Sequence, residues 1–213
     1  MRPALDERAV DVWLLPGSPY DGEPELARLL GSYADPPRAV LRQWDEHGRP
    51  VIPGRPELFA SISHTRGMTI VGVGRAVRVG VDIEAVRDRG LACLPEHALT
   101  AREQQDIAGF ADDRPTEAFL SYWTRKEALL KAVGVGLLVE PSLIELPPPG
   151  ASTRVLTVPG GLGEAANWSL TEFRIPGFAA SAAVETPAPA IRIMEAVRCG
   201  WSLGVHPHRT WRS

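Results

Sequence analysis

The sequence predicts an α/β (α+β) protein, because strand-like and helix-like hydrophobic patterns recur along one chain. Residues 10–15 and 68–73 are short apolar runs next to Pro and Gly, as expected of strands. Residues 77–84 alternate Val79, Val81 and Ile83 onto one face, which is the period of a half-buried strand. Residues 115–134 instead repeat large apolar side chains at helical spacing. With 213 residues and 44% hydrophobic content, the chain is long enough for one domain or two small ones.

The helices have recognisable ends. Residues 25–33 predict a short helix with three leucines on one face, and residues 38–44 a second short helix. Thr100 followed by Glu103 forms a capping box, which predicts a helix reaching to about Phe110 and is a sufficient role for Glu103. Pro115 suits the first turn of the following helix, and Gly134 suits its end.

The remaining segments predict strands and one tail. The turn at residues 74–76 predicts a hairpin between strands 68–73 and 77–84. Three further strands are expected at residues 154–158, 168–174 and 178–184. Residues 186–190 are typical of a linker. The segment after it is expected to be a helix over residues 191–199 or largely mobile, and its two tryptophans favour partial order.

Composition excludes several classes of function. The net charge of −3 lacks the basic excess of a nucleic-acid-binding protein, so we expect no nucleic-acid partner. No apolar run is long enough to span a bilayer, and the N-terminus has no secretory signal, so we expect no membrane association. Cys93 and Cys199 are far apart and form no metal motif, which favours a reducing, cytoplasmic location.

The strand at residues 77–84 carries a pair of carboxylates. Asp82 and Glu84 stand two residues apart and therefore point to the same side, beside Gly80, which leaves room for close approach. The alternative is a strand that ends in an acidic, solvated turn.

The helix at residues 115–134 carries a third carboxylate. Glu127 lies within the stripe formed by Trp123 and Leu130, Lys131 follows it by one turn, and Lys126 flanks it. An ordinary Glu–Lys pair on a solvated face, worth ~0.2–0.5 kcal/mol, is the alternative. Taken together, three carboxylates and nearby lysines suit a hard divalent cation bound to a phosphorylated ligand.

These two segments carry a resemblance to a known family. They are Gly80-Val81-Asp82-Ile83-Glu84 and Trp123-x-x-Lys126-Glu127-x-x-x-Lys131. The pair, in this order, resembles the signature of the 4′-phosphopantetheinyl transferases, and the larger, monomeric type that activates peptide and polyketide synthases is the closer match. The resemblance covers about residues 10 to 185.

The resemblance implies a fold and a division of the chain. It implies two similar α/β halves related by a pseudo-twofold, with the active site in the cleft between them. We accordingly expect an N-terminal half at residues 1–78, a C-terminal half with the metal motifs at residues 79–186, and a Pro-led tail at residues 187–213.

The resemblance also implies a reaction. The family transfers 4′-phosphopantetheine from coenzyme A to a serine of an apo acyl or peptidyl carrier protein, and releases adenosine 3′,5′-bisphosphate. Magnesium is the expected cofactor, manganese could replace it at an oxygen site, and coenzyme A is the co-substrate. The alternatives are a metal-dependent phosphohydrolase of coenzyme A or a nucleotide, and a non-catalytic relative that binds coenzyme A.

Two further segments extend the resemblance. His47-Gly48-Arg49-Pro50 resembles the family's Gly-Lys-Pro, with Arg49 in place of lysine, and a plain turn is the alternative. Phe59-Ala60-Ser61-Ile62-Ser63-His64-Thr65 resembles Asn-x-Ser-His-Ser, in which Ser63 and His64 match directly; a structural histidine is the alternative. The helical region before residue 47 is shorter than in the family, so contacts to the coenzyme's 3′-phosphate cannot be carried over there.

The resemblance assigns roles to single residues. The implied metal ligands are Asp82, Glu84 and Glu127. The implied catalytic residues are Glu127, Lys131 and His64, with Glu127 as candidate general base. The implied coenzyme-binding residues are Arg49, Ser63, His64, Lys126 and Lys131. The two roles of Glu127 compete, because a carboxylate held by a metal ion is a poorer base.

Overall fold

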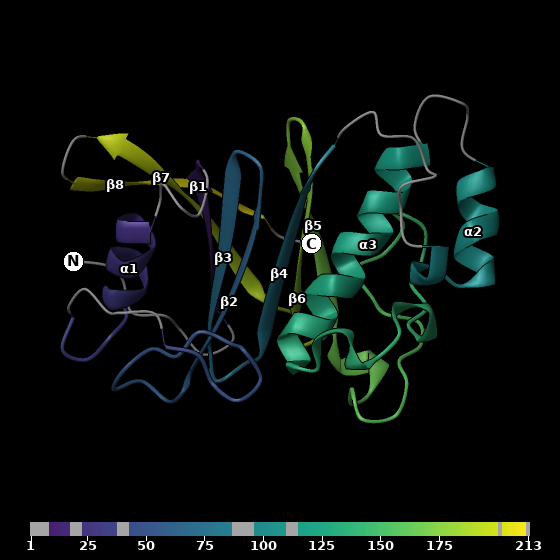
Figure 1. Cartoon of the computed structure of the whole chain (residues 1–213), viewed down its shortest axis with the longest axis horizontal. Coiled ribbons are helices and arrows are strands. Elements are labelled where there is room, and N and C mark those ends of the chain that lie inside the picture. The colour runs from purple at the N-terminus through teal and green to yellow at the C-terminus, as the bar shows by residue number, and fades with distance from the viewer. Residues whose placement is uncertain are drawn as a thin grey trace.

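The protein is built in layers, and a computed structural model describes residues 9–17, 23–37, 43–86, 96–109, 115–199 and 202–211. From one end to the other, helix α1, a five-stranded sheet, a three-stranded sheet, helix α3 and helix α2 lie side by side (Figure 1). The helices are α1 (Glu23–Gly31), α2 (Ala101–Ala108) and α3 (Pro115–Val133). The strands are β1 (Ala9–Pro16), β2 (Leu58–Thr65), β3 (Met68–Arg75), β4 (Val79–Ala85), β5 (Ser169–Ile175), β6 (Phe178–Val184), β7 (Ala190–Cys199) and β8 (Ser202–Trp211). Short 3₁₀ turns are η2 (Glu96–Ala98), η3 (Gly136–Leu138), η4 (Pro141–Leu143) and η5 (Ala165–Asn167).

The five-stranded sheet has the order β2-β3-β1-β7-β8. Its pairs are antiparallel except for β1 with β7, which run parallel. Helix α1 covers one face, where Leu26, Leu29 and Leu30 pack with the fully buried Trp13. The leucine stripe predicted from the sequence is therefore confirmed as the buried face of this helix.

The three-stranded sheet has the order β4-β6-β5 and carries helix α3 on one face (Figure 1). The helix packs directly onto β4, because a Cβ at Gly80 would overlap the backbone of Ala128 and Ala132. The predicted bounds of α3 are confirmed, and Gly134 ends it with a φ of +85°. Gly80 is thus the point at which the helix and the strand touch backbone to backbone.

The two sheets face each other across a shared apolar layer. Val10 and Val12 of the first sheet pack there with Val81 and Ile83 of the second. At the edge of this layer β2 runs beside β4, although the two strands belong to different sheets. Between these two strands, side-chain hydroxyls of β2 take the place of the backbone hydrogen bonds that paired strands would form. The Ser61 Oγ accepts from the Val81 N–H at 3.1 Å, and the Thr65 Oγ1 accepts from the Ala85 N–H at 3.3 Å.

Several strand predictions are corrected. The hairpin expected between residues 68–73 and 77–84 is wrong: β3 pairs with β2 and β1, whereas β4 pairs with β6. Residues 154–158 form only isolated bridges, at Arg154 and Thr157. Residues 190–199 form strand β7 in place of the helix offered as one alternative. Of the second short helix expected at residues 38–44, residues 38–42 lie outside the described part.

Two expectations about the whole molecule can be compared with this architecture. The predicted mixed α/β fold is confirmed, and its strands form two sheets, while the pseudo-twofold relation and the proposed division of the chain stay predictions. Among the described helices, none combines the length and the apolar character that crossing a membrane requires.

Candidate active site

Three predicted site residues meet where β2, β4 and α3 come together. The Ser63 Oγ donates to the Asp82 Oδ1 at 2.7 Å, and the Lys131 Nζ donates to the same carboxylate oxygen at 2.6 Å. The Lys131 Nζ also donates to the Ser63 Oγ at 3.0 Å, which closes a triangle. Asp82 is almost fully buried, whereas the Lys131 side chain is 31% exposed. The ammonium group therefore lies at the boundary between a buried carboxylate and solvent, within reach of an anionic ligand.

Glu127 lies next to this triangle, one turn of α3 before Lys131. Burial raises the pKa of its carboxyl, Lys131 opposes that shift, and the neighbouring carboxylates of Asp82 and Glu84 add to it. Asp82 and Glu84 are therefore near enough to Glu127 for their charges to act on its carboxyl. A raised pKa also means that Glu127 holds a proton more readily than an ordinary glutamate.

The unpartnered oxygens of this group are the feature that fits a cation. The Asp82 Oδ2 and the Glu127 Oε1 are both buried, and neither has a hydrogen-bond partner. Buried carboxylate oxygens without donors are costly, and a hard divalent ion is the type of partner that they suit. Within the described ranges, however, no three His, Cys, Asp or Glu side chains are assembled into a ready-made metal site. Lys131 instead holds the Asp82 Oδ1.

Lys126 does not lie in this group. Its side chain is fully buried on the α2 side of α3, where the Nζ donates to the Glu103 Oε2 at 2.5 Å and to the Ala98 carbonyl at 2.8 Å. Burial lowers the pKa of this ammonium, and Glu103 opposes that shift. The expectation that Lys126 flanks Glu127 and contacts the coenzyme is therefore not supported by its position. The physical reason is that neighbouring helix residues point about 100° apart.

Glu103 has a larger role than the capping predicted for it. The capping box with Thr100 is present as expected. In addition, the Glu103 Oε1 accepts from the Leu146 N–H at 2.9 Å, and its other oxygen binds Lys126. One buried carboxylate thus connects α2, α3 and the loop that follows η4. The capping motif was visible in the sequence, but the distant Lys126 and Leu146 partners were not.

Arg49 and His64 occupy separate places at the edge of the site. Arg49 lies against Gly134 at the C-terminal end of α3 and forms an ion pair with Asp45 at 2.8 Å. Burial would raise the pKa of Asp45, but hydrogen bonds from Arg49 and His47 lower it. His64 is exposed, and the alternation of β2 directs it to the face opposite Ser63. His64 is therefore not adjacent to Asp82 through its side chain.

A row of polar contacts continues from the triangle across the sheet. Asp82, Ser181 and Glu172 are register partners on β4, β6 and β5, so their side chains share the face under α3. Thr124 of α3 contacts Ser181 through a 2.9 Å hydroxyl–hydroxyl bond. The Ser121 Oγ donates to the Glu172 Oε2 at 2.7 Å. No motif in the sequence marks these four polar partners, whereas Asp82 stands in a recognisable motif.

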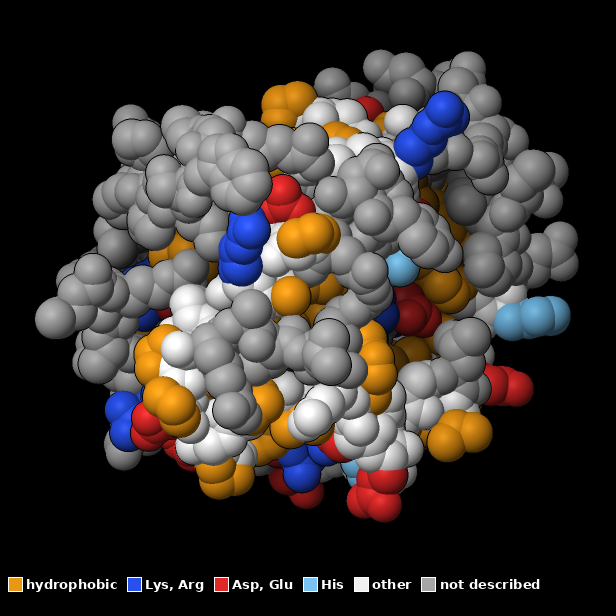
Figure 2. Space-filling model, turned by 60° about the vertical axis from the view of Figure 1, so that its left-hand side comes forward, with side chains coloured by type: hydrophobic (Ala, Val, Ile, Leu, Met, Phe, Trp, Pro, Cys, Tyr) orange, Lys and Arg blue, Asp and Glu red, His pale blue; other side chains and the backbone are white. Residues whose placement is uncertain are grey.

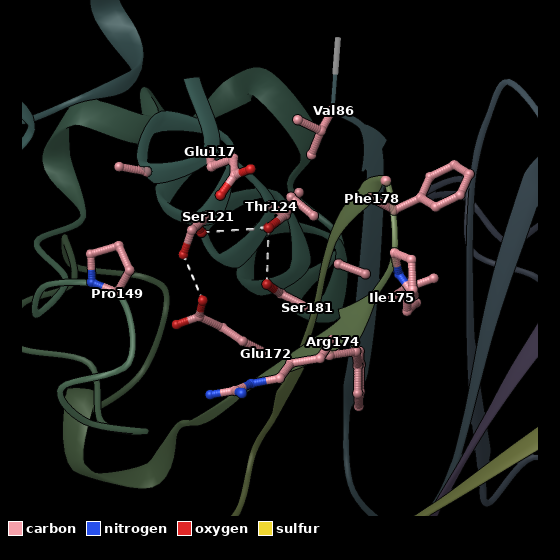
Figure 3. A pocket seen from close by; sticks show the side chains of 16 residues that line it. Val86, Glu117, Ser121, Thr124, Pro149, Glu172, Arg174, Ile175, Phe178 and Ser181 are labelled. Atoms are coloured by element: carbon pink, nitrogen blue, oxygen red, sulfur yellow. Dashed lines mark hydrogen bonds between the residues drawn. The ribbon is translucent and has the colours of Figure 1, made fainter. Parts of the chain in front are cut away.

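A pocket opens at the far end of this row. Its volume is about 660 Å³, and it lies between the N-terminal half of α3 and the β5–β6 hairpin. Figure 3 shows Glu117, Ser121 and Thr124 of the helix on one wall, and Phe178 on the opposite side. The pocket therefore begins one sheet position away from Asp82, at Ser181.

One face of the molecule has a hollow that contains charged side chains (Figure 2). On the face in Figure 2, acidic and basic side chains lie deep in a hollow bordered by hydrophobic side chains, with a histidine nearby. Elsewhere on this face the exposed hydrophobic side chains are scattered among polar ones, as on most protein surfaces.

Comparison with known proteins shows which family and which individual proteins have similar sequences. A family model described as the 4′-phosphopantetheinyl transferase superfamily matches residues 78–183. The chain is 30% identical over 153 residues to the 4′-phosphopantetheinyl transferase HetI of Nostoc sp., a match that covers 69% of this chain and 61% of that protein. It is 29% identical over 92 residues to the 4′-phosphopantetheinyl transferase Sfp of Bacillus subtilis, covering 43% of this chain and 40% of Sfp.

The matches cover only part of this chain and only part of each relative. The chain spans about three fifths of HetI and less than half of two Bacillus subtilis relatives, Sfp and another 4′-phosphopantetheinyl transferase. The family match includes β4, α3, β5 and nearly all of β6, and with them Asp82, Glu84, Glu127 and Lys131.

Proposed function

Because the chain belongs, through residues 78–183, to the 4′-phosphopantetheinyl transferase superfamily, we propose that it transfers 4′-phosphopantetheine from coenzyme A to a serine of a carrier protein. The acceptor is an apo acyl or peptidyl carrier protein, and the released product is adenosine 3′,5′-bisphosphate. The observation that carries this proposal is the buried Asp82–Ser63–Lys131 triangle with Glu127 beside it.

The reaction needs positive charge and a proton acceptor. The serine oxygen forms a bond to the phosphorus that carries pantetheine, and the bond from that phosphorus to the bridging pyrophosphate oxygen breaks. Lys131, which is already at the edge of solvent, is placed to neutralise the negative charge that develops on the phosphate oxygens. Glu127 takes the proton of the serine hydroxyl, and its raised pKa makes it a better proton acceptor than an exposed glutamate.

Asp82, Glu84 and Glu127 are the residues that would hold a magnesium ion. When bound, the ion would polarise the pyrophosphate and offset its charge. The unpartnered oxygens of Asp82 and Glu127 support this assignment by their chemistry. Ser63 orients Asp82, since its hydroxyl is committed to that carboxylate and to Lys131. Lys126 is left out of the proposed site because its ammonium is buried against Glu103.

The phosphates of the coenzyme are assigned to the cations at the C-terminal end of α3. Lys131 is in the last turn of this helix, and Arg49 lies against Gly134 just beyond it. An arginine fork binds phosphate well, although Arg49 would have to share its guanidinium with Asp45. His64 is exposed at the end of β2 and is assigned to the outer part of the coenzyme, away from the reacting phosphorus.

The test is the mass of an apo carrier protein after incubation with this protein, coenzyme A and magnesium. A panel of peptide, polyketide and fatty-acid carriers is used, with a sample without magnesium and the Glu127→Gln variant as matched controls. The proposal expects a mass gain of one phosphopantetheine group on the acceptor serine. Both controls should show little or no gain, because one lacks the cation and the other lacks the carboxylate.

Each other outcome points to a different function. Hydrolysis of coenzyme A without modification of any carrier would identify a phosphohydrolase. Binding of coenzyme A with neither transfer nor hydrolysis would identify a non-catalytic relative. Full activity of the Glu127→Gln variant would remove Glu127 from both the base role and the metal role.

A further inference from the structure

We propose that the pocket between α3 and the β5–β6 hairpin receives the serine-bearing segment of the carrier protein. This inference rests on the proposed function, because it assigns a place to that reaction's acceptor. The pocket has a volume of about 660 Å³, and one of its lining residues, Ser181, is the register partner of Asp82 (Figure 3). The pocket therefore lies one strand away from Asp82.

The cationic, acidic and pocket-lining groups follow one another in order along α3. Arg49 lies against Gly134 at the C-terminal end, Lys131 lies in the last turn, and Glu127 comes one turn earlier. Thr124 and Ser121, which line the pocket, follow toward the N-terminus. At 1.5 Å per residue, Thr124 and Lys131 are separated by about 10 Å along the helix axis. The cations and the pocket thus lie on opposite sides of Glu127.

The geometry of in-line phosphoryl transfer, combined with this order, predicts from which side the serine hydroxyl approaches the phosphorus. The attacking and leaving oxygens stand roughly in line on opposite sides of the phosphorus. If the reacting phosphorus lies beside Asp82 and Glu127, the anionic leaving group extends toward Lys131 and Arg49. The serine hydroxyl must then arrive from the opposite side, which is the side of the pocket. A carrier segment seated there would present its hydroxyl to the Glu127 carboxylate.

The lining of the pocket suits a protein segment better than the phosphates of the coenzyme. Glu117 and Glu172 line it together with Arg174, so its charged lining is acidic on balance and disfavours phosphate groups. Phe178, Ile175 and Val86 offer apolar surface, while Ser121 and Thr124 offer hydroxyls. We therefore expect an uncharged stretch of chain, with an apolar side chain beside the acceptor serine. The competing occupant is the neutral pantetheine arm of the coenzyme.

The experiment fills the pocket from the helix side. Ser121 is half-buried and lines the pocket six positions before Glu127, outside the proposed reacting group. In Ser121→Phe and the smaller Ser121→Leu, the new side chain should obstruct the carrier segment and raise the KM for the carrier about tenfold or more. The KM for coenzyme A and its directly measured Kd should stay at wild-type values. Ser121→Ala, which removes the hydroxyl without filling the pocket, should raise the carrier KM much less.

The control Ala101→Phe adds the same bulk on exposed α2, away from the pocket, and should leave both KM values unchanged. A higher KM and Kd for coenzyme A with an unchanged carrier KM would place the pantetheine arm in the pocket and overturn the inference. Unchanged values for both substrates would overturn it too. If Ser121→Phe does not fold, Ser121→Leu decides. Failure of the wild-type protein to modify any carrier would refute the proposed function first, and the inference with it.

Discussion

Glu127 is a residue at which stability and the proposed activity oppose each other. Its carboxyl is half-buried, and burial together with Asp82 and Glu84 raises its pKa above that of an exposed glutamate. Between the unfolded and the folded pKa, the folded state binds more protons, so the free energy of unfolding falls as pH rises through this interval. The ionised Glu127 therefore destabilises the fold at neutral pH, where the proposed reaction needs it.

Replacing this carboxylate should make the protein more stable and inactive. We predict that Glu127→Gln has a higher Tm than the wild-type protein at neutral pH, because the cost of the buried charge is removed. The difference should shrink as pH falls and vanish below the pKa of an unfolded glutamate, about 4.3. Thermal unfolding followed by circular dichroism over a pH series measures this. A variant less stable than wild type at neutral pH would contradict the sign.

The effect of magnesium on Tm provides a second test of Glu127, and this test does not require the protein to be active. Added magnesium should raise the Tm of the wild-type protein, because binding to the folded state alone stabilises it. The increase should be smaller in Glu127→Gln, which lacks one proposed oxygen ligand. Equal increases in the two proteins would exclude Glu127 from the cation site.

At this scale the sequence located the carboxylates but not all their partners. Asp82 and Glu127 could be recognised because strand alternation and helical spacing fix the side on which they lie. The same helical spacing turns Lys126 about 100° away from Glu127, but it does not reveal what lies on that side of the helix. The actual partner of Lys126, Glu103, is 23 residues distant, and nothing in the sequence around either residue links them.

The buried Lys126–Glu103 pair fixes helix α3 against α2. Both side chains are fully buried, and the lysine also bonds to the Ala98 carbonyl. Removing one partner leaves an uncompensated buried charge, so we predict that Lys126→Met lowers the free energy of unfolding by about 3–5 kcal/mol. Urea denaturation measures the loss.

A double variant separates charge from packing in this pair. Glu103→Gln added to Lys126→Met should recover part of the stability, since no unpaired charge remains and glutamine preserves the capping box. If the double variant were less stable than Lys126→Met alone, the penalty could not come from the unpaired Glu103 carboxylate.

The contact between α3 and β4 depends on the missing side chain of Gly80. A Cβ at this position would overlap the backbone of Ala128 and Ala132, and backbone atoms cannot move aside as a flexible side chain can. We predict that Gly80→Ala displaces α3, costs about 1–3 kcal/mol or more and strongly reduces transfer. Gly160→Ala is the matched control, because its added Cβ meets no atom within 4 Å. Equal stability of the two variants would show that the contact is not close.

The wrong hairpin has a physical explanation at the scale of elements. Residues 68–75 and 79–85 are two apolar strands with a short turn between them, and this pattern is typical of a hairpin. The same pattern allows β4 to leave the first sheet and pair with β6. Gly72 and Gly74 permit the sheets to approach there, since Cβ atoms at these positions would crowd Val79 and Val81. Strand alternation determines which face is buried, but not which strand is the partner.

At the scale of the whole molecule, strands β7 and β8 return to the sheet that contains β1. Strand β7 pairs in parallel with β1, so β1 lies inside the five-stranded sheet and not at its edge. The Arg192 Nε donates to the buried Asp11 Oδ1 at 2.6 Å, and the Tyr33 hydroxyl donates to the other oxygen of that carboxylate at 2.6 Å. The segment expected to be a tail therefore contributes to the sheet that supports β2 and Ser63.

Deleting residues 190–213 should disrupt the first sheet as a unit. The deletion would turn β1 into an edge strand with unpaired backbone groups and would remove one of the two hydrogen-bond donors to Asp11, which is 3% exposed. We predict that the shortened protein aggregates on size-exclusion chromatography. Arg192→Ala is the matched control: it keeps the strand but leaves Asp11 with one donor fewer, at a cost of about 1–3 kcal/mol. This variant should stay monodisperse with a lower Tm. A shortened protein that is monodisperse and as stable as Arg192→Ala would show that the C-terminal segment is dispensable for this sheet.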